Sequence, residues 1–360
     1  MVVDLATVEQ VLNKGKDMGA SDIHITVGIP PMVRVNGSLI PLDYPELSPE
    51  DTQRMVYSLM NDKQRAAYEE RGEIDFSFAL GSTGRFRVNA YKQKGACECA
   101  LRIVGMQIPK PEQLGLSEDV IELYKKKRGL ILVTGPTGSG KSTTLASIID
   151  KINDSRDAHI ITLEDPIEYL HNHRKSMINQ REIGLDTLSY AAALRAALRE
   201  DPDVILVGEM RDLETISTAI TAAETGHLVL STLHTIGAAA TIDRIIDVFP
   251  PHQQQQIRVQ LAMVLEAVIS QQLMPTADRR ARVAAFEVMF ANSAIRNLIR
   301  ESKTPQIMSI IQTNRKDGMI TMDDAIYDLY QRGLVTRDDA ITFAQDSAFM
   351  MRKIPGGSMY

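Results

Sequence analysis

A glycine-rich segment, GPTGSGKS at 135–142, constrains the fold more than any other part of this sequence. It lies between LILVT, which is typical of a buried strand, and STTLASIID, which is typical of a helix. This strand–loop–helix context is the one in which the pattern G-x-x-x-x-G-K-S/T binds phosphate. Its glycines allow backbone twists that point successive N–H groups into a concave nest, and the helix N-terminus adds partial positive charge. The segment therefore predicts a nucleotide site on an α/β fold.

Nine consecutive residues are expected to form this site. They are Gly135, Pro136, Thr137, Gly138, Ser139, Gly140, Lys141, Ser142 and Thr143. In the pattern, the lysine ammonium reaches the β- and γ-phosphates and the serine hydroxyl binds Mg²⁺. We therefore expect ATP and Mg²⁺ as cofactors.

The chain from residue 116 onward alternates short apolar strands with helices. The strands are GLILVTG, HIITLE, DVILVGE and HLVLSTLH, and the helices run from Lys141 to about Ile152, around SYAAALRAALRE, and from 212 to 225. This alternation predicts a doubly wound α/β sheet that is buried on both faces. After Ile236 the pattern becomes mainly helical. We expect LAMVLEAVISQQL, SAIRNLIRE, TMDDAIYDLYQRG and TRDDAITFAQD to be helices, ARVAAFEVMF to be one or two strands, and the tail KIPGGSMY to be mobile.

The first part of the chain predicts a separate α+β domain. Residues 4–18 and SPEDTQRMVYSLMNDKQRAAYEERG indicate helices, the second with Ser48 as its cap and Pro49 at its first position. SDIHITVG and PPMVRVNGSLIPL indicate strands, and RFRVNAYKQKGACECALRIV indicates a hairpin around Lys94-Gly95. The expected organisation is an N-terminal domain at 1–105, a proline-containing linker at 106–115 and an ATPase domain at 116–360.

Composition excludes several classes of protein. The net charge is −6 and the pI is about 5.7, so nothing overall favours nucleic acid. No apolar run approaches the ~18–20 residues that span a bilayer, and the N-terminus lacks the features of a signal peptide. The two cysteines, Cys97 and Cys99, are too few for a structural zinc site and are expected to be plain reduced thiols. These features indicate a cytoplasmic protein without zinc.

Two of the predicted strands end on carboxylates, Glu164 with Asp165 in IITLEDP and Glu209 in DVILVGE. Ligands of a doubly wound sheet lie beyond the carboxyl ends of its strands, so these acids should face the crevice of the phosphate loop. Phosphoryl transfer to water needs Mg²⁺ and a group that orients the water. We expect Glu209 to hold the metal with Ser142, directly or through water, and Glu164 to polarise the water. Asp165 is equally suited to capping the next turn, and solvated strand ends are the alternative for all three.

Histidines and arginines stand near the same strand ends. In HLVLSTLHT, His234 closes the strand and faces the crevice, whereas His227 opens it and needs a bend or a neighbouring subunit to take part. A structural role is the alternative for both histidines. Three arginines, Arg195, Arg199 and Arg211, form either a charge relay or a plain ion-pair network, and ALRAALRE places the first two on one helix face.

The predicted hairpin places Arg87 directly opposite Arg102 when Lys94-Gly95 form its turn. Like charges that face each other across strands are unfavourable by up to ~1 kcal/mol. Neighbouring acids or a bound polyanion would offset this cost. We hypothesise that both arginines complete a nucleotide site on an adjacent subunit, and a solvated surface pair is the alternative.

Five motifs occur in a fixed order: GPTGSGKSTT, ITLEDPIEY, INQREIG, ALRAALREDPDVILVGEMRD and TAAETGHLVLSTLHT. Together they resemble the secretion ATPase superfamily of type II secretion and type IV pili. GASDIHI near the start and AIRNLIRE at 294–301 narrow the resemblance to the PilT-like retraction ATPases of type IV pili, over essentially all 360 residues.

This resemblance implies a PAS-like N-terminal α+β domain, then a RecA-like P-loop ATPase domain with a helical C-terminal part, in a homohexamer. It implies that Glu164 is the catalytic glutamate, that Glu209 is the Walker B carboxylate and that His227 and His234 form the His box. Arg87 and Arg102 match the N-terminal arginines that contact nucleotide. The implied retraction motif is Ala294, Ile295, Arg296, Asn297, Leu298, Ile299 and Arg300.

The function that the resemblance implies is Mg²⁺-dependent ATP hydrolysis that drives pilus disassembly and twitching motility. The implied partner is the inner-membrane pilus platform protein, with the ATPase cytoplasmic and peripheral to that membrane. Pilus extension and type II secretion ATPases are alternatives, but they usually carry an extra N-terminal domain and a four-cysteine zinc insertion, which Cys97 and Cys99 do not fit. A RecA-like nucleic-acid translocase, a small-molecule P-loop kinase and an ATP-binding scaffold without turnover are further alternatives.

Overall fold

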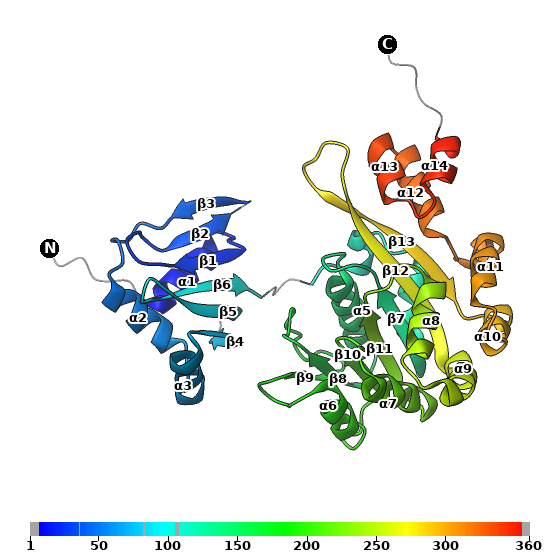
Figure 1. Ribbon diagram of the computed structural model, residues 1–360, viewed down its shortest axis with the longest axis horizontal. Helices are drawn as coiled ribbons and strands as arrows, with labels where there is room; N and C mark the ends of the chain where they lie inside the picture. Colours follow the sequence, from blue (N-terminus) through cyan, green and yellow to red (C-terminus); the bar gives the residue numbers. More distant parts are fainter. Residues whose placement is uncertain (1–6, 36, 82–83, 105–107, 355–360) are drawn as a thin grey trace, which may run out of the picture. The chain divides into compact units, whose positions relative to one another are not determined.

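The computed structural model describes residues 7–35, 37–81, 84–104 and 108–354. The chain forms two compact units (Figure 1). The first comprises residues up to 106 with 168–170, and the second comprises the remaining residues. Each unit has its own sheet and its own apolar core.

The first unit is an antiparallel sheet of six strands in the order β3-β2-β1-β6-β5-β4. Its strands are β1 (Asp22–Ile25), β2 (Met32–Val35), β3 (Ser38–Pro41), β4 (Glu73–Leu80), β5 (Gly84–Gln93) and β6 (Ala96–Ile103). Its helices are α1 (Val8–Asp17), α2 (Pro49–Ser58) and α3 (Asp62–Arg71). The core gathers α1 and α2 against one face of the sheet, where Cys97 and Cys99 are buried free thiols.

Two predictions for this unit are corrected. The helix expected over 48–72 is two helices, because Asn61 caps α3 and forms a capping box with Gln64 that starts a new helix. Strand β4 was not predicted, and its whole length pairs with residues 84–91 of β5. The cap Ser48 and the first-position Pro49 are confirmed.

The second unit holds a sheet of seven strands in the order β13-β12-β7-β11-β10-β8-β9. All pairs are parallel except β12 with β13. The strands are β7 (Gly129–Thr134), β8 (His159–Glu164), β9 (Met177–Glu182), β10 (Val204–Val207), β11 (Leu228–Leu233), β12 (Leu265–Pro275) and β13 (Arg282–Phe290). The α-helices are α4 (Glu118–Ile121), α5 (Lys141–Ser155), α6 (Tyr190–Ala197), α7 (Leu213–Glu224), α8 (Ala238–Asp247), α9 (Pro251–Val264), α10 (Ser293–Arg300), α11 (Ile307–Thr313), α12 (Met322–Gln331), α13 (Arg337–Phe343) and α14 (Ser347–Lys353).

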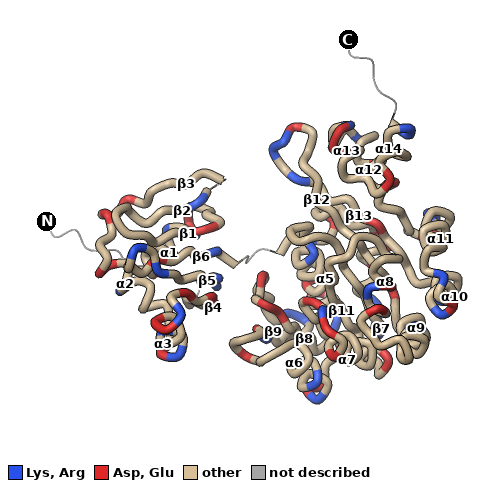
Figure 2. The backbone as a smooth tube through the Cα atoms, viewed as in Figure 1, with Lys and Arg blue, Asp and Glu red and all other residues tan. Residues whose placement is uncertain are grey.

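Helices cover both faces of this sheet, as the buried strands require. One core packs α6 to α10 against one set of strand side chains, and a second core packs α5 and the segment 114–124 against the other set. Figure 1 shows α12, α13 and α14 gathered beyond the β12–β13 pair. Basic and acidic residues are interspersed over both units (Figure 2). None of the described helices is both long enough and apolar enough to cross a membrane.

The apolar stretch LAMVLEAVISQQL, expected to be one helix, is divided between α9 and β12. The prediction was wrong because a short apolar run gives the same pattern in a buried helix and in a strand buried on both faces. Pairing decides the outcome here: β12 lies between β7 and β13, and its residues from Ala267 to Gln272 are buried.

The predicted linker and the predicted mobile tail also differ from expectation. Within the predicted linker 106–115, Pro111–Leu114 forms a short 3-10 helix (η1), and residues 106 and 107 lie outside the described residues. The tail was expected to be mobile, but Ile354 is fully buried and the Lys353 ammonium lies 2.6 Å from the Asp324 carboxylate. The rest of the predicted tail, 355–360, lies outside the described residues.

Candidate nucleotide site

The phosphate loop leaves the carboxyl end of β7 and enters α5. Gly135, Gly138 and Gly140 have φ angles of 140°, 79° and 92°, in the region that favours glycine. Pro136, Thr137 and Gly138 are exposed at the tip of the loop, Ser139 is buried, and Ser142 and Thr143 are half-buried in the first turn of α5. The predicted strand, loop and helix are all present.

The Lys141 side chain is buried and lies over the loop. Its Nζ donates hydrogen bonds to the main-chain oxygens of Gly135, at 2.9 Å, and Pro136, at 3.0 Å. A buried ammonium requires such partners, because losing water without replacement costs several kcal/mol. These bonds hold the charge at the loop, where an anion bound by the loop's N–H groups would meet it.

Gln271 of β12 packs against the phosphate loop and the start of α5. Sequence reasoning missed it because this part of β12 was expected to be helical. Its Oε1 accepts a hydrogen bond of 2.8 Å from the Thr144 hydroxyl in the first turns of α5. A Cβ atom at Gly135 would lie 2.2 Å from the Gln271 main-chain oxygen, and one at Gly140 would lie 2.9 Å from its Nε2. The loop is therefore packed directly against the neighbouring strand.

We expect Gly135→Ala to abolish nucleotide binding and to lower the melting temperature more than Gly138→Ala. Both positions have positive φ, which costs an alanine about 1–2 kcal/mol. Gly135 alone of the two also meets main-chain atoms, whereas nothing lies within 4 Å of a Cβ at Gly138. Thermal unfolding and fluorescent-ADP titration check this. Equal melting temperatures for the two variants would contradict the described packing.

Glu164 is the last residue of β8, and two side chains hold its carboxylate. The Thr162 hydroxyl donates to Glu164 Oε1 at 2.6 Å, and Gln180 Nε2 donates to the same oxygen at 3.1 Å. The next residue, Asp165, is exposed, and the main-chain N–H of Ile167 in the following turn donates to Glu182. Glu164 therefore stands half-buried and oriented at the carboxyl end of the sheet.

Glu209 follows β10 and contacts two cationic or titratable side chains. Its Oε2 lies 2.8 Å from Arg211 Nε and 3.3 Å from His234 Nε2. His234 follows β11, the neighbour of both β10 and β7, and the Gly135 N–H donates to the Leu233 oxygen. The structure thus brings Glu209, Arg211 and His234 together beside the start of the phosphate loop.

Tyr190 responds to the charges of the three strand-end acids, and no sequence motif drew attention to it. It opens α6, and its hydroxyl lies 2.7 Å from the position of a Cβ on Gly208. Burial, together with the negative charges of Glu209, Asp165 and Glu164, raises the pKa of Tyr190. The negative charges of all three carboxylates therefore contribute to the raised pKa of one phenol.

Three predicted site residues, His227, Arg195 and Arg199, make their contacts outside this group. His227 precedes β11 at the opposite end from His234, and its Nδ1 lies 2.9 Å from the Ala222 oxygen. The Arg195 guanidinium forms an ion pair with Glu214 on α7. Arg199 does not share a helix face with Arg195 as predicted, because α6 ends at Ala197 and Arg199 lies in the following turn.

The register of the N-terminal hairpin places Arg87 opposite Arg102, as predicted, and Lys94 and Gly95 both have positive φ in its turn. Asp22 of β1 lies opposite Arg102 on its other side, with Oδ1 3.0 Å from Arg102 Nε. Burial would raise the pKa of Asp22, but hydrogen bonds from Ser21 and Arg102 outweigh it and lower that pKa. A neighbouring acid thus offsets part of the like-charge cost.

The segment AIRNLIRE forms α10, with Ile295 and Ile299 buried against α9. Arg296 donates to the main-chain oxygens of Ala262 and Met263 at the end of α9, and its NH2 lies 3.2 Å from Glu266. Arg300 bonds Asn297 at 2.5 Å within the same helix. In this chain, Arg296 therefore fixes the junction between α9 and β12.

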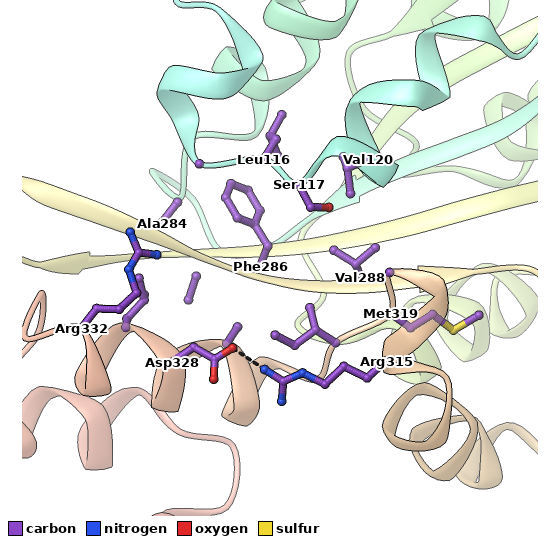
Figure 3. Close-up of a pocket in the computed structure, with 16 residues that line it drawn as sticks. Leu116, Ser117, Val120, Ala284, Phe286, Val288, Arg315, Met319, Asp328 and Arg332 are labelled. Carbon is purple, nitrogen blue, oxygen red and sulfur yellow. Dashed lines mark hydrogen bonds and ion pairs between the residues drawn. The ribbon is translucent and has the colours of Figure 1, made fainter.

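A cavity of about 300 Å³ opens beside the phosphate loop. Gly140 and Thr143 line it on the loop side, and Leu114, Leu273 and Leu334 supply apolar surface. A second cavity, of about 280 Å³, lies between the segment 115–120, β13 and α12 (Figure 3). Phe286 and Val288 form part of its lining, and the Arg315–Asp328 ion pair stands at one side (Figure 3). Among the described residues, no three His, Cys, Asp or Glu side chains form a group that would hold a metal.

Comparison with known proteins places the chain in a family. The model of the type II/IV secretion system protein family matches residues 4–322. The chain belongs to this family. Among its curated relatives, the type IV pilus retraction ATPase PilT of Pseudomonas aeruginosa is 48% identical to it over 92% of this chain and 96% of the relative's own length. A twitching motility protein of Neisseria gonorrhoeae is 51% identical, covering 89% and 86%.

A solved structure of a pilus retraction motor, PilT, with bound ADP is similar throughout. Its TM-score is 0.90 at 51% identity, and the match covers 97% of this chain and 100% of that one. The expected α/β fold is thereby confirmed, and so is the secretion ATPase family that the motifs indicated.

Proposed function

We propose that the protein is an Mg²⁺-dependent ATPase whose hydrolysis drives retraction of type IV pili. One observation carries this proposal. The chain is similar over 97% of its length to an ADP-bound retraction motor, and it has a phosphate loop in which Lys141 bonds the loop's own main chain, with acids at the neighbouring strand ends. Binding ATP there would place its γ-phosphate near the crevice that holds Glu164 and Glu209.

Each residue then has a distinct chemical role. The loop N–H groups and Lys141 bind the phosphates, and the cavity beside Gly140 and Thr143 is large enough for the base. Ser142 and Glu209 supply oxygen ligands, which suit Mg²⁺, a cation that neutralises charge on the phosphates. Glu164 orients and deprotonates the attacking water. His234, whose Nε2 contacts the Glu209 carboxylate, would respond to whether Glu209 holds the metal beside the γ-phosphate.

The proposal extends to assembly. Arg87 and Arg102 lie exposed on a sheet of the first unit, where they would reach the phosphates of a neighbouring copy in a homohexamer. His227, at the opposite end of β11 from His234, would contact the same neighbouring copy. The first unit would act as a PAS-like domain and the second as a RecA-like motor, working at the cytoplasmic side of the inner membrane on the pilus platform protein.

Deletion of the gene in its own organism tests the function. We expect abundant surface pili with lost twitching, because assembly continues without disassembly, and we expect the wild-type gene but not Lys141→Ala to restore motility. Electron microscopy of pili and a stab assay of twitching give the two readouts. Absent pili would indicate extension, and normal pili with normal twitching would indicate another secretion system or a redundant paralogue.

A further inference from the structure

Gln180 is the third residue of the motif INQREIG at 178–184, to which the proposed mechanism gives no task. It lies on β9, the edge strand beside β8, directly opposite Thr162 in the parallel register. Its Nε2 donates to Glu164 Oε1 at 3.1 Å. Gln180 is thus bonded to the carboxylate that we assign to water activation.

The orientation of the Gln180 amide is fixed at its other end. Its Oε1 accepts a hydrogen bond of 2.9 Å from the main-chain N–H of His171. Because that oxygen faces a donor, the NH₂ group must be the end that faces Glu164. The side chain therefore bridges the segment after β8 to the tip of β8 itself.

Thr162 supplies a second donor to the same carboxylate oxygen. It is fully buried on β8, and its hydroxyl lies 2.6 Å from Glu164 Oε1. Hydrogen bonds to an ionised acceptor are about twice as strong as neutral ones. Two such bonds from adjacent strands to one oxygen fix both the rotation of the carboxylate and the direction of its other oxygen.

We propose that Gln180 and Thr162 are positioning residues for ATP hydrolysis, which hold Glu164 in the orientation that aligns the attacking water. This inference rests on the proposed role of Glu164. A carboxylate that rotates freely spends less time aligned with the water, so removal of either donor slows the chemical step without weakening nucleotide binding. The substrate of this step is a nucleoside triphosphate, and Gln180 and Thr162 act on it only through Glu164.

The test uses two near-isosteric variants of the full-length protein, Gln180→Met and Thr162→Val. Each should lower kcat about tenfold, the effect of one lost charge-assisted hydrogen bond, with KM within about twofold of wild type. Thr162→Ser keeps the hydroxyl and should retain most of the rate. Gln260→Met is the matched control: Gln260 Nε2 also donates to a carboxylate, that of Glu224, at 3.0 Å, but on α9 and α7 at the surface.

A double-mutant cycle separates positioning from a general structural effect. In a Glu164→Gln background, Gln180→Met should lower the remaining single-turnover rate by less than about twofold, because the side chain that Gln180 positions can no longer act as a base. A full kcat in Gln180→Met, or a further tenfold loss in the Glu164→Gln background, would overturn the inference. If Glu164→Gln itself hydrolysed ATP normally, the proposed function of Glu164 would fail first, and the two failures are therefore distinguishable.

Discussion

Glu164→Gln is expected to lower kcat for ATP hydrolysis by about 10²–10⁴-fold while nucleotide affinity changes little, because general-base catalysis contributes on that scale. Glutamine keeps the shape of glutamate and one oxygen that can accept from Thr162 and Gln180, so the fold at the end of β8 should persist. It cannot take the proton of the attacking water. Phosphate release under saturating Mg-ATP, together with an ADP titration, measures both quantities.

A surface carboxylate provides the control for this variant. Glu224 lies exposed at the end of α7 and bonds Gln260, so Glu224→Gln should keep the wild-type rate. If Glu164→Gln retained a rate within threefold of wild type, Glu164 would have no part in activating water. The positions of Lys141 and Glu209 would then support nucleotide binding alone.

Stability is expected to fall by about 3 kcal/mol between pH 6.5 and pH 4 through one residue, His171. Its side chain is 3% exposed, and burial, followed by the nearby positive charge of Arg174, lowers its pKa from 6.5 to about 4. Between these values the unfolded chain binds a proton that the native state does not, so the free energy of unfolding decreases as the pH falls. Each pH unit in this interval is worth about 1.4 kcal/mol.

The surroundings explain why the neutral ring is favoured. His171 Nδ1 lies 3.9 Å from Asp150 on α5, which is too far for a hydrogen bond, and Arg174 binds the same carboxylate at 3.1 Å. Urea unfolding of wild type and His171→Phe at several pH values should show the stability difference shrinking or reversing in favour of the variant toward pH 4. His252→Phe, at an exposed histidine, is the control. Parallel pH curves for wild type and His171→Phe would refute the prediction.

The residues that sequence reasoning placed correctly share a local signal. The phosphate loop, the strand ends at Glu164 and Glu209, and the pairing of Arg87 with Arg102 each follow from a few adjacent residues: a glycine spacing, an apolar run before an acid, or a two-residue turn. Such signals act through backbone geometry and therefore do not need a partner from elsewhere in the chain. His227 and His234 likewise fell at opposite ends of one strand, as their spacing required.

The residues that sequence reasoning missed depend on partners far along the chain. Gln271 meets the loop because β12 inserts beside β7, more than a hundred residues away in sequence, and Tyr190 meets Gly208 because α6 packs on the sheet. Gln180 stood in a recognised motif, but its bond to Glu164 depends on the register between β8 and β9. The break between α2 and α3 at residues 59–61 was overlooked because a capping box interrupts a sequence that favours helix on both sides.

The sequence by itself determined the phosphate loop between a buried strand and a helix, and the acids that follow two further buried strands, because each of these signals lies in consecutive residues. The tertiary structure decided which side chains hold the acids and the loop in place: Thr162 and Gln180 on Glu164, Arg211 and His234 on Glu209, and Gln271 behind Gly135. The physical reason is that these contacts arise from strand pairing and helix packing, whose register is set by the whole apolar core.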